Sequence, residues 1–244
     1  MAIIGVFGYA GSGKDTVGNL IQYTLSKGSN TSFEEVIKDY NIHEWWLEEM
    51  SSWEIKKWAG KLKTVASLIT GIDVEKFEDQ EFKKTNLGPE WNIPKKYESD
   101  ALWIAEDGES YEEPMTVRDL LQRLGTEAMR DGLHKNVWVN ALMADYVPTQ
   151  VQWSQGPIGG YEDGPLPNWI ITDTRFPNEA KAIKDAGGVV IKIERPGVVP
   201  INDHPSETAL KDYDFDYVIH NNGNIDDLVN NVKKFTNSSV FTSL

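Results

Sequence analysis

Residues 8–16, Gly-Tyr-Ala-Gly-Ser-Gly-Lys-Asp-Thr, constrain the fold of this chain more than any other stretch. An apolar run at residues 3–7 precedes them and a helical pattern follows, so the segment joins a buried strand to a helix. Its glycines and lysine have the spacing G-x-x-x-x-G-K of a phosphate-binding loop. Glycines let successive N–H groups turn towards an anion, and the helix that follows presents its positive N-terminal end. The stretch therefore predicts a phosphate site at the end of the first strand.

The residue after Lys14 departs from the common form of this motif. Asp15 stands where a Ser or Thr hydroxyl usually ligates magnesium, and Thr16 follows one position later. Either residue could act on a magnesium ion or on its water ligands, and the pattern leaves the choice open. A glycine-rich turn without a ligand is the alternative for the whole stretch, but the flanking strand and helix favour the phosphate loop.

The composition limits the partners of the chain. Its 38 acidic residues outnumber 24 Lys and Arg, which gives a net charge of −14 and disfavours binding to a nucleic-acid polymer. Any phosphate site must therefore gather basic side chains locally. The absence of cysteine excludes disulfides, thiolate zinc sites and cysteine nucleophiles. We see no signal peptide or membrane span, so we expect a cytoplasmic protein that does not bind membranes.

Apolar periodicity predicts alternating strands and helices. We expect strands at residues 2–7, 169–173, 189–193 and 217–219, and helices at residues 15–27, 33–70, 116–130, 134–146, 177–186 and 225–235. Strand–helix alternation indicates a parallel sheet with helices on both faces. We expect a single domain over residues 1–244. Residues 86–114, rich in acids and prolines, and residues 147–168, with little periodicity, are expected to be insertions that could act as lids.

A second polar group, Asp173-Thr174-Arg175, ends an apolar strand. Ligands in open parallel sheets bind beyond the carboxyl ends of the strands, so we expect these side chains beside the phosphate loop. Asp173 could hold magnesium through water or orient a cation, and Arg175 offers a bidentate fork to phosphate. Glu179, one helical turn later, could orient Arg175. The alternative is a surface arginine–carboxylate pair with ordinary helix capping.

A third group lies on the helix predicted at residues 116–130, where Thr116 and Asp119 form a capping-box pattern. An α-helical period puts Arg118, Gln122 and Gly125 on one face. The pattern also pairs Thr126 with Arg130 one turn apart, and these arginines supply the local positive charge. Gln122 could read a nucleobase edge, and Gly125 would allow a ligand to approach closely. The alternative is an ordinary solvent-facing polar surface.

Several blocks of residues, in order along nearly the whole chain, carry a resemblance to a known family. The blocks are Gly8 to Thr16, Ala59 to Lys63, Arg118 to Gln122, Gly125 to Glu127, Arg130, Trp138, Asp173 to Glu179 and His204 to Glu207. Together they resemble phage-type deoxynucleoside monophosphate kinases of the P-loop kinase superfamily. The resemblance implies an α/β fold of the P-loop NTPase type, a three-layer sandwich with helical and loop insertions. Its central parallel sheet would have the strand order 2-3-1-4-5.

The resemblance also implies an activity and a set of site residues. The activity is transfer of the γ-phosphoryl group of ATP to a deoxynucleoside monophosphate (dNMP), with Mg²⁺ as cofactor. The residues implied to hold ATP are Gly11, Ser12, Gly13, Lys14, Asp15 and Thr16, with Asp15 or Thr16 acting on the metal. Those implied to bind the acceptor are Lys63, Arg118, Gln122, Gly125, Thr126, Arg130, Trp138, Asp173, Arg175 and Glu179. Lys14, Arg130, Asp173 and Arg175 are the catalytic candidates.

The sequence departs from the family pattern at two places, and two other functions are compatible with it. Asp119 follows Arg118 where a second basic residue is usual, and Gly60-Lys61 stands where Asp-Pro is frequent. We interpret His204 as a loop-ordering residue. The rivals are a P-loop kinase for another small acceptor and a nucleotide-binding regulatory protein without turnover. The basic cluster at 118–138 favours an enzyme. The resemblance allows a homodimer, and in a phage protein the location would be the host cytoplasm.

Overall fold

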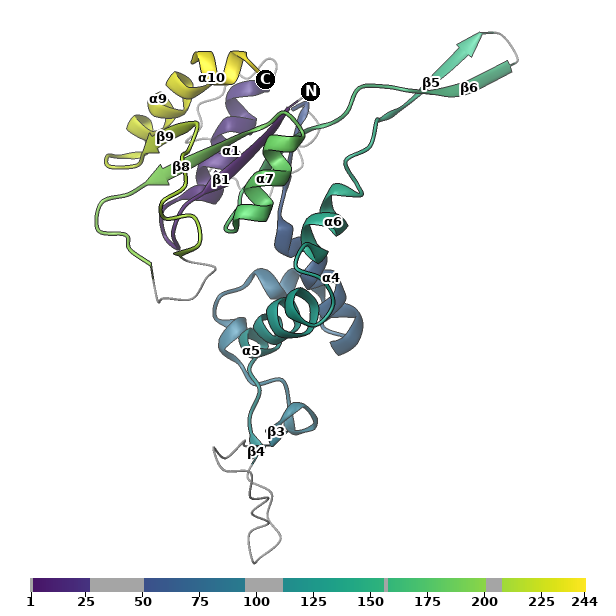
Figure 1. Cartoon of the computed structure of the whole chain (residues 1–244), viewed down its shortest axis with the longest axis vertical. Coiled ribbons are helices and arrows are strands. Elements are labelled where there is room, and N and C mark those ends of the chain that lie inside the picture. The colour runs from purple at the N-terminus through teal and green to yellow at the C-terminus, as the bar shows by residue number, and fades with distance from the viewer. Residues whose placement is uncertain (1, 27–50, 95–111, 156–157, 201–207) are drawn as a thin grey trace, which may run out of the picture. The chain divides into compact units, whose positions relative to one another are not determined.

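The computed structural model describes residues 2–26, 51–94, 112–155, 158–200 and 208–244 (Figure 1). Contacts divide the chain into two compact units. The first comprises Met1–Trp58 and Val139–Leu244, and the second comprises Ala59–Trp138. Among the described residues, no helix combines the length and the apolar character that crossing a membrane would require.

The first unit is built on a five-stranded parallel sheet. Its strands are β1 (Ile3–Phe7), β2 (Trp53–Lys56), β7 (Asn168–Ile171), β8 (Val189–Glu194) and β9 (Tyr217–His220). They lie side by side in the order β2-β7-β1-β8-β9, and every neighbouring pair is parallel. Numbered along the chain, this is the order 2-3-1-4-5. The prediction of an α/β fold with a central parallel sheet is confirmed.

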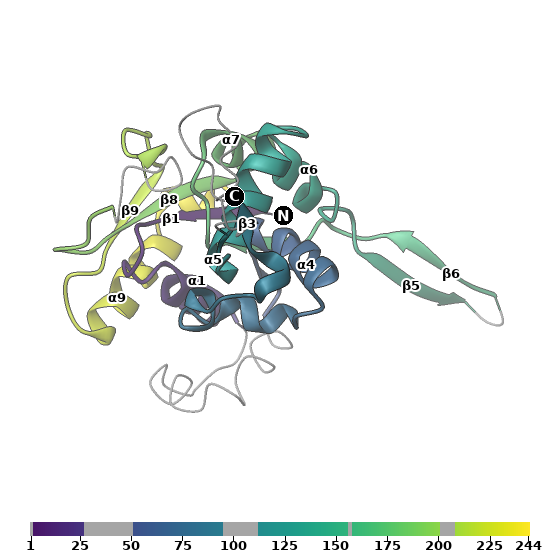
Figure 2. The ribbon, with the colours of Figure 1, turned by 90° about the horizontal axis from the view of Figure 1, so that it is seen from below.

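Helices cover both faces of this sheet, and Figure 2 shows α1 (Lys14–Leu25) and α9 (Ile225–Thr236) on one side and α7 (Pro177–Asp185) on the other. Because side chains of a strand alternate between faces, Ile4 and Val6 of β1 join the core with α1 and α9. Ile3 and Phe7 join the second core, to which α7 contributes Ile183. Residues of β1 are buried on both faces, which explains the continuous apolar run before the phosphate loop.

The second unit begins within α4 (Trp58–Thr70) and is mostly helical. Short 3₁₀ turns follow at Val74–Glu78, Phe82–Lys84 and Pro89–Trp91, and β3 (Ile93–Pro94) pairs with β4 (Glu112–Glu113). Next come α5 (Val117–Gln122), a π-helix (Arg123–Asp131) and the start of α6 (Val137–Met143). A small core of Ala66, Phe77 and Val117 holds the unit together.

The prediction of a helix over residues 33–70 is wrong for residues 53–56. Residues 27–50 lie outside the described residues, but Trp53–Lys56 form β2, paired in register with β7. Helical propensity is a weak guide there, because pairing with β7 and burial of Trp53 outweigh it. Trp53 and Trp58 are both buried.

Three further predictions need correction. Residues 147–168 are not a structureless loop, because Gln150–Gln155 (β5) and Ile158–Asp163 (β6) pair as an antiparallel hairpin. The polar–apolar alternation at residues 150–153 carries the strand signal that was missed. The helix expected at 134–146 is shorter, Val137–Met143, and that at 116–130 changes to a π-helix after Gln122. Of the insertion expected at residues 86–114, residues 95–111 lie outside the described part of the chain. The expectation of a single domain over residues 1–244 stays a prediction.

Substitution of Gly188, in the turn between α7 and β8, tests how closely this turn packs against β1. A methyl group added at Gly188 would collide with the backbone carbonyl of Ile3 and would meet the Ile183 carbonyl at 3.0 Å. At Gly5 the collision is instead with the flexible tip of the Ile183 side chain. We predict that Gly188→Ala lowers the free energy of unfolding by about 1–3 kcal/mol or more, and Gly5→Ala by clearly less. Urea denaturation of the two variants measures this, and equal or reversed losses would contradict the packing described.

Candidate active site

The phosphate loop joins β1 to α1 through glycines in a conformation that other residues avoid. Gly11 and Gly13 have φ angles of 81° and 90°, in the left-handed region. The Ser12 N–H donates to the Tyr9 carbonyl at 3.0 Å, which closes the turn. α1 then starts at Lys14 with Gly13 as its N-cap and no side-chain cap. A helix start without its own cap, preceded by a glycine turn, has the geometry of an anion site.

Two side chains that follow strands β8 and β9 bind carbonyl groups of this loop. Asn221, directly after β9, donates from Nδ2 to the Ser12 carbonyl at 2.8 Å. Arg195, directly after β8, donates from Nη1 to the Gly11 carbonyl at 3.1 Å. Because the C=O and N–H of a peptide point in opposite directions, anchoring the Ser12 carbonyl turns the Gly13 N–H the other way. The sequence interpretation did not include either side chain, although both follow the carboxyl ends of strands.

Ser12 carries an unsatisfied polar group inside the loop. Its side chain is 1% exposed, and its Oγ has no hydrogen-bond partner among the residues that the structure describes. A buried hydroxyl without a partner is uncommon and suits a site that a ligand completes. A pocket of about 290 Å³ adjoins the loop. It is lined by Tyr9, Ser12, Lys192, Ile193, Glu194, Arg195, Pro196, Val198, His220 and Asn222.

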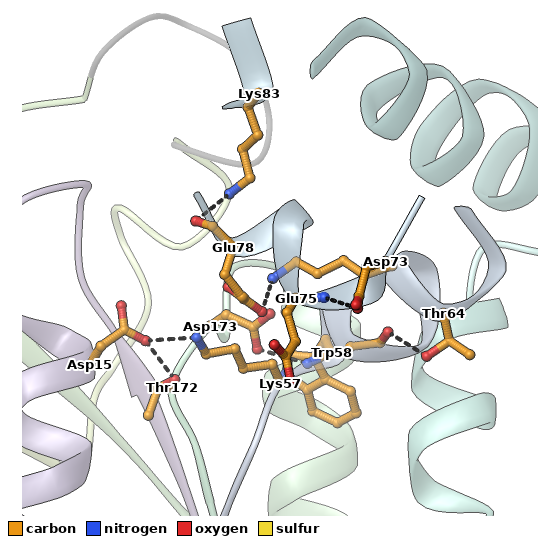
Figure 3. Close-up of polar contacts among 12 residues, drawn as sticks. Asp15, Lys57, Trp58, Thr64, Asp73, Glu75, Glu78, Lys83, Thr172 and Asp173 are labelled. Atoms are coloured by element: carbon orange, nitrogen blue, oxygen red, sulfur yellow. Dashed lines mark hydrogen bonds and ion pairs between the residues drawn. The ribbon is translucent and has the colours of Figure 1, made fainter. Parts of the chain in front are cut away.

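Asp15, in the first turn of α1, is held by two partners (Figure 3). Its Oδ1 accepts a hydrogen bond from Thr172 Oγ1 at 2.9 Å and lies 3.5 Å from Lys57 Nζ. Burial by itself would raise the pKa of the Asp15 carboxyl. The positive charges of Lys57 and Lys14 and the hydrogen bond from Thr172 outweigh burial and hold that pKa below its ordinary value. Asp15 is therefore a carboxylate at neutral pH.

Asp173 lies after β7, at the same edge of the sheet, and stabilises the start of α4 (Figure 3). Its Oδ1 accepts the backbone N–H of Trp58 at 2.7 Å, and the Trp58 indole donates to Thr174 Oγ1 at 3.3 Å. A carboxylate at a helix N-terminus is favourable because the helix dipole is positive there. The structure thus gives Asp173 a positioning role that the sequence did not suggest. Its predicted action on metal or phosphate stays a prediction.

Glu179 orders the turn that carries Arg175. The side chain of Glu179 is 2% exposed, and its Oε2 accepts the backbone N–H groups of Arg175 at 2.7 Å and Phe176 at 3.1 Å. This bonding caps α7 and fixes the main chain of Arg175. Glu179 therefore orients Arg175 through its backbone. The direct contact of both residues with a substrate, implied by the resemblance, stays a prediction.

In the second unit, most of the predicted acceptor residues lie on or near α5 and the π-helix. Lys63, on α4, is buried and forms an ion pair with Glu78, a partner that the sequence did not reveal. Arg118 is exposed and donates from Nη2 to Gln80 Oε1 at 3.4 Å. Gln122 is exposed, and Thr126 and Arg130 are partly buried.

The face predicted for Arg118, Gln122 and Gly125 is correct only for the first two. The α-helical period ends at Gln122, and the wider π turns rotate Gly125 into the interior of the unit. There a Cβ atom on Gly125 would lie 2.9 Å from the side chain of Leu62, and the Gly125 carbonyl accepts the Trp138 indole N–H at 2.9 Å. The close approach that Gly125 allows is thus to Leu62, and its contact with a ligand stays a prediction.

Metal ligands are sparse in this site. Across the described ranges, no three His, Asp or Glu side chains gather closely enough to hold a metal ion by themselves. His204 lies outside the described residues. The first turn of α1 carries Asp15 and Thr16, and Asp173 follows β7 at the same edge of the sheet. The capping box of Thr116 and Asp119 is confirmed and serves helix α5.

Comparisons with known proteins identify the family of this chain. A family model described as deoxynucleotide monophosphate kinase matches residues 95–232. The deoxynucleoside-5′-monophosphate kinase of Escherichia phage T5 is 27% identical over 256 residues, which cover 95% of this chain and 92% of that protein. The deoxynucleotide monophosphate kinase of Enterobacteria phage T4 is 30% identical over 122 residues, covering 50% of this chain and 46% of that protein.

A relative in Acanthamoeba polyphaga mimivirus is 34% identical over 125 residues, which cover 48% of this chain and 59% of that protein. The alignments thus span about half of the mimivirus and T4 proteins and nearly all of the T5 enzyme. The family model alone covers more than half of the chain. These matches confirm the family predicted from the motif blocks: the chain belongs to the deoxynucleotide monophosphate kinase family.

Proposed function

We propose that this protein transfers the γ-phosphoryl group of ATP to a dNMP, giving the diphosphate and ADP. The observation that carries the proposal is the phosphate loop, with its left-handed glycines, uncapped helix start and unsatisfied Ser12 hydroxyl. Membership of the kinase family supports ATP as the phosphoryl donor and a nucleotide as the acceptor.

The donor site in this proposal is the loop itself. Gly11, Ser12 and Gly13 offer N–H groups and the Ser12 hydroxyl to the phosphate oxygens, and Lys14 neutralises their charge. The adjoining pocket of about 290 Å³ takes the nucleoside part of ATP. Arg195 and Asn221 stabilise the conformation of the loop through hydrogen bonds to its carbonyl groups.

The residues near the loop fit a magnesium ion that keeps several waters and is shared with phosphate oxygens. No hydrogen bond of the Thr16 hydroxyl is seen in the described part of the chain, whereas Asp15 already binds Thr172 and Lys57. We therefore assign the direct contact to Thr16 and a contact through water to Asp15. When bound, the ion neutralises charge on the donor phosphates.

The acceptor residues are assigned from the family resemblance. Arg118, Gln122, Thr126 and Arg130 bind the dNMP in this proposal, with Lys63 as a further phosphate contact. Gly125 and Trp138 are bonded to each other and shape the site. Asp173, Arg175 and Glu179 are assigned to the reacting phosphates, Asp173 and Glu179 also fixing the backbone around them.

The chemistry is an in-line displacement at the γ-phosphorus. An oxygen of the acceptor phosphate forms the new P–O bond as the bond to the β,γ-bridging oxygen breaks, and the electron pair leaves with ADP. Lys14, Arg130 and Arg175 stabilise the charge spread over the transferred group. Such a transfer depends on positioning and charge far more than on a strong base, so a histidine is not needed.

A coupled assay that detects ADP, run with ATP and each of the four dNMPs, tests the function. ADP formation that depends on a dNMP supports the proposal, whereas turnover only with another small acceptor supports the first rival. Binding of ATP without any acceptor supports a regulatory protein. The bases accepted follow from the same assay. The homodimer and the cytoplasmic location stay predictions.

The loop lysine gives the first test of the mechanism. We predict that Lys14→Met lowers kcat by at least about 10²-fold, because it removes a preorganised charge from the phosphate site. The fold is expected to persist, as judged by circular dichroism and the melting temperature. Lys181→Met is the matched control, since Lys181 is exposed on α7 and pairs with Asp185. Near-normal kinetics for Lys14→Met would contradict the assignment of the loop.

Arg175 gives the second test. We predict that Arg175→Ala lowers kcat/KM by at least about 10²-fold, the scale of losing one charged contact to the transition state. Arg175→Lys, which keeps the charge without the fork, is expected to recover only part of that loss. An unchanged kcat/KM for Arg175→Ala in the same steady-state assay would reject the proposed role.

A further inference from the structure

Lys57 occupies the edge of the sheet where the phosphate loop lies. β2 and β7 are parallel, and Lys56 at the end of β2 pairs with Ile171 at the end of β7. The Thr172 N–H donates to the Lys56 carbonyl at 3.2 Å, so Lys57 and Thr172 are the first residues beyond the paired strands. The carboxyl ends of parallel strands share one edge of the sheet, the edge at which ligands bind.

Asp15 holds the Lys57 ammonium beside the loop. Lys57 Nζ lies 3.5 Å from Asp15 Oδ1, and the same oxygen accepts the hydroxyl of Thr172, which is fully buried (Figure 3). The buried Thr172 fixes the carboxylate, and the carboxylate in turn positions the lysine. Asp15 directly follows Lys14 in the first turn of α1, and the charges of Lys57 and Lys14 both act on the Asp15 carboxylate.

The charges at the loop explain why a lysine beside Asp15 favours the binding of phosphate. The chain carries a net charge of −14, and Asp15 places one of its negative charges where phosphates are to bind. A carboxylate there repels the ligand unless cations offset it. Lys57 offsets it, and an ammonium group with three N–H donors can contact a carboxylate and a phosphate oxygen together. The Lys57 side chain is 33% exposed, so solvent and ligand can reach it.

We propose that Lys57 is a phosphate-binding residue, whose ammonium group, positioned by Asp15, contacts an oxygen of the nucleotide phosphates bound at the loop. The proposal rests on the donor site assigned above and adds a residue to it. The alternative is that the Asp15–Lys57 pair only ties α1 to the end of β2. Partly exposed ion pairs of this kind contribute little to stability, which favours a role in binding.

The neighbouring lysine provides a matched control. Lys56 Nζ pairs with Glu54 at 2.6 Å and lies 5.5 Å from the centroid of the Trp169 ring. Lys56 and Lys57 thus have the same charge and length one residue apart, but only Lys57 contacts the carboxylate of the phosphate loop helix.

Two measurements on the full chain test the proposal: affinity for inorganic tripolyphosphate by calorimetry, and kcat/KM for ATP at saturating dNMP. We expect Lys57→Met to weaken tripolyphosphate binding and to lower kcat/KM by about tenfold or more, the loss typical of a charged hydrogen bond. Lys56→Met is expected to stay within about twofold of the wild type, since exposed pairs contribute little. Lys57→Arg, which keeps the charge, is expected to restore most of the affinity.

Equal affinities for Lys57→Met and Lys56→Met, with a lower melting temperature for Lys57→Met alone, would overturn the proposal in favour of a structural tie. Should Lys57→Met not fold, Lys57→Gln replaces it with the same expected loss. A wild-type protein that binds tripolyphosphate but phosphorylates no dNMP would refute the proposed function, while the Lys57 comparison would still be decided by calorimetry. Absence of tripolyphosphate binding by the wild type would overturn the Lys57 proposal, while the coupled assay would still decide the proposed function.

Discussion

The rest of the structure depends on the turn between β1 and α1. Left-handed φ angles at Gly11 and Gly13 reverse the chain tightly enough for α1 to start, without a side-chain cap, at the end of the central strand. β1 lies between β7 and β8, and residues that follow β7, β8 and β9 bind the turn and the start of α1. Arg195 and Asn221 bind its carbonyls, and Thr172 binds Asp15. The sheet thus sets the shape of the loop as well as its place.

Charge is the second constraint. A chain with a net charge of −14 can bind a triphosphate only where cations are concentrated, and the loop edge gathers Lys14, Lys57 and Arg195. Asp15 works against this concentration by its own charge. Burial would raise the pKa of its carboxyl, but Lys57, Lys14 and the hydrogen bond from Thr172 together hold that pKa below its ordinary value. In the proposed function, Asp15 positions a cation and contacts the metal through water, and the Thr16 hydroxyl is assigned the direct contact with the metal.

The sequence predicted the elements whose signals are local. The apolar run of β1, the glycine loop and the Thr116–Asp119 capping box are each encoded within a few residues, and the strand order followed from the family resemblance. β2 was missed because its pairing with β7 depends on residues more than a hundred positions away. That error also hid Lys57, which is recognisable as a site residue only once it is known to end a strand. The π-helix that turns Gly125 inward has no simple sequence pattern.

The central claim is that the loop binds ATP so that its γ-phosphoryl group passes directly to a dNMP. The most direct measurement follows radioactive γ-phosphate from ATP in the presence of one accepted dNMP, with products separated by chromatography. The account predicts that the label enters the deoxynucleoside diphosphate in a one-to-one ratio with the ADP formed. Label recovered only as inorganic phosphate, or retained in ATP with every dNMP, would contradict it.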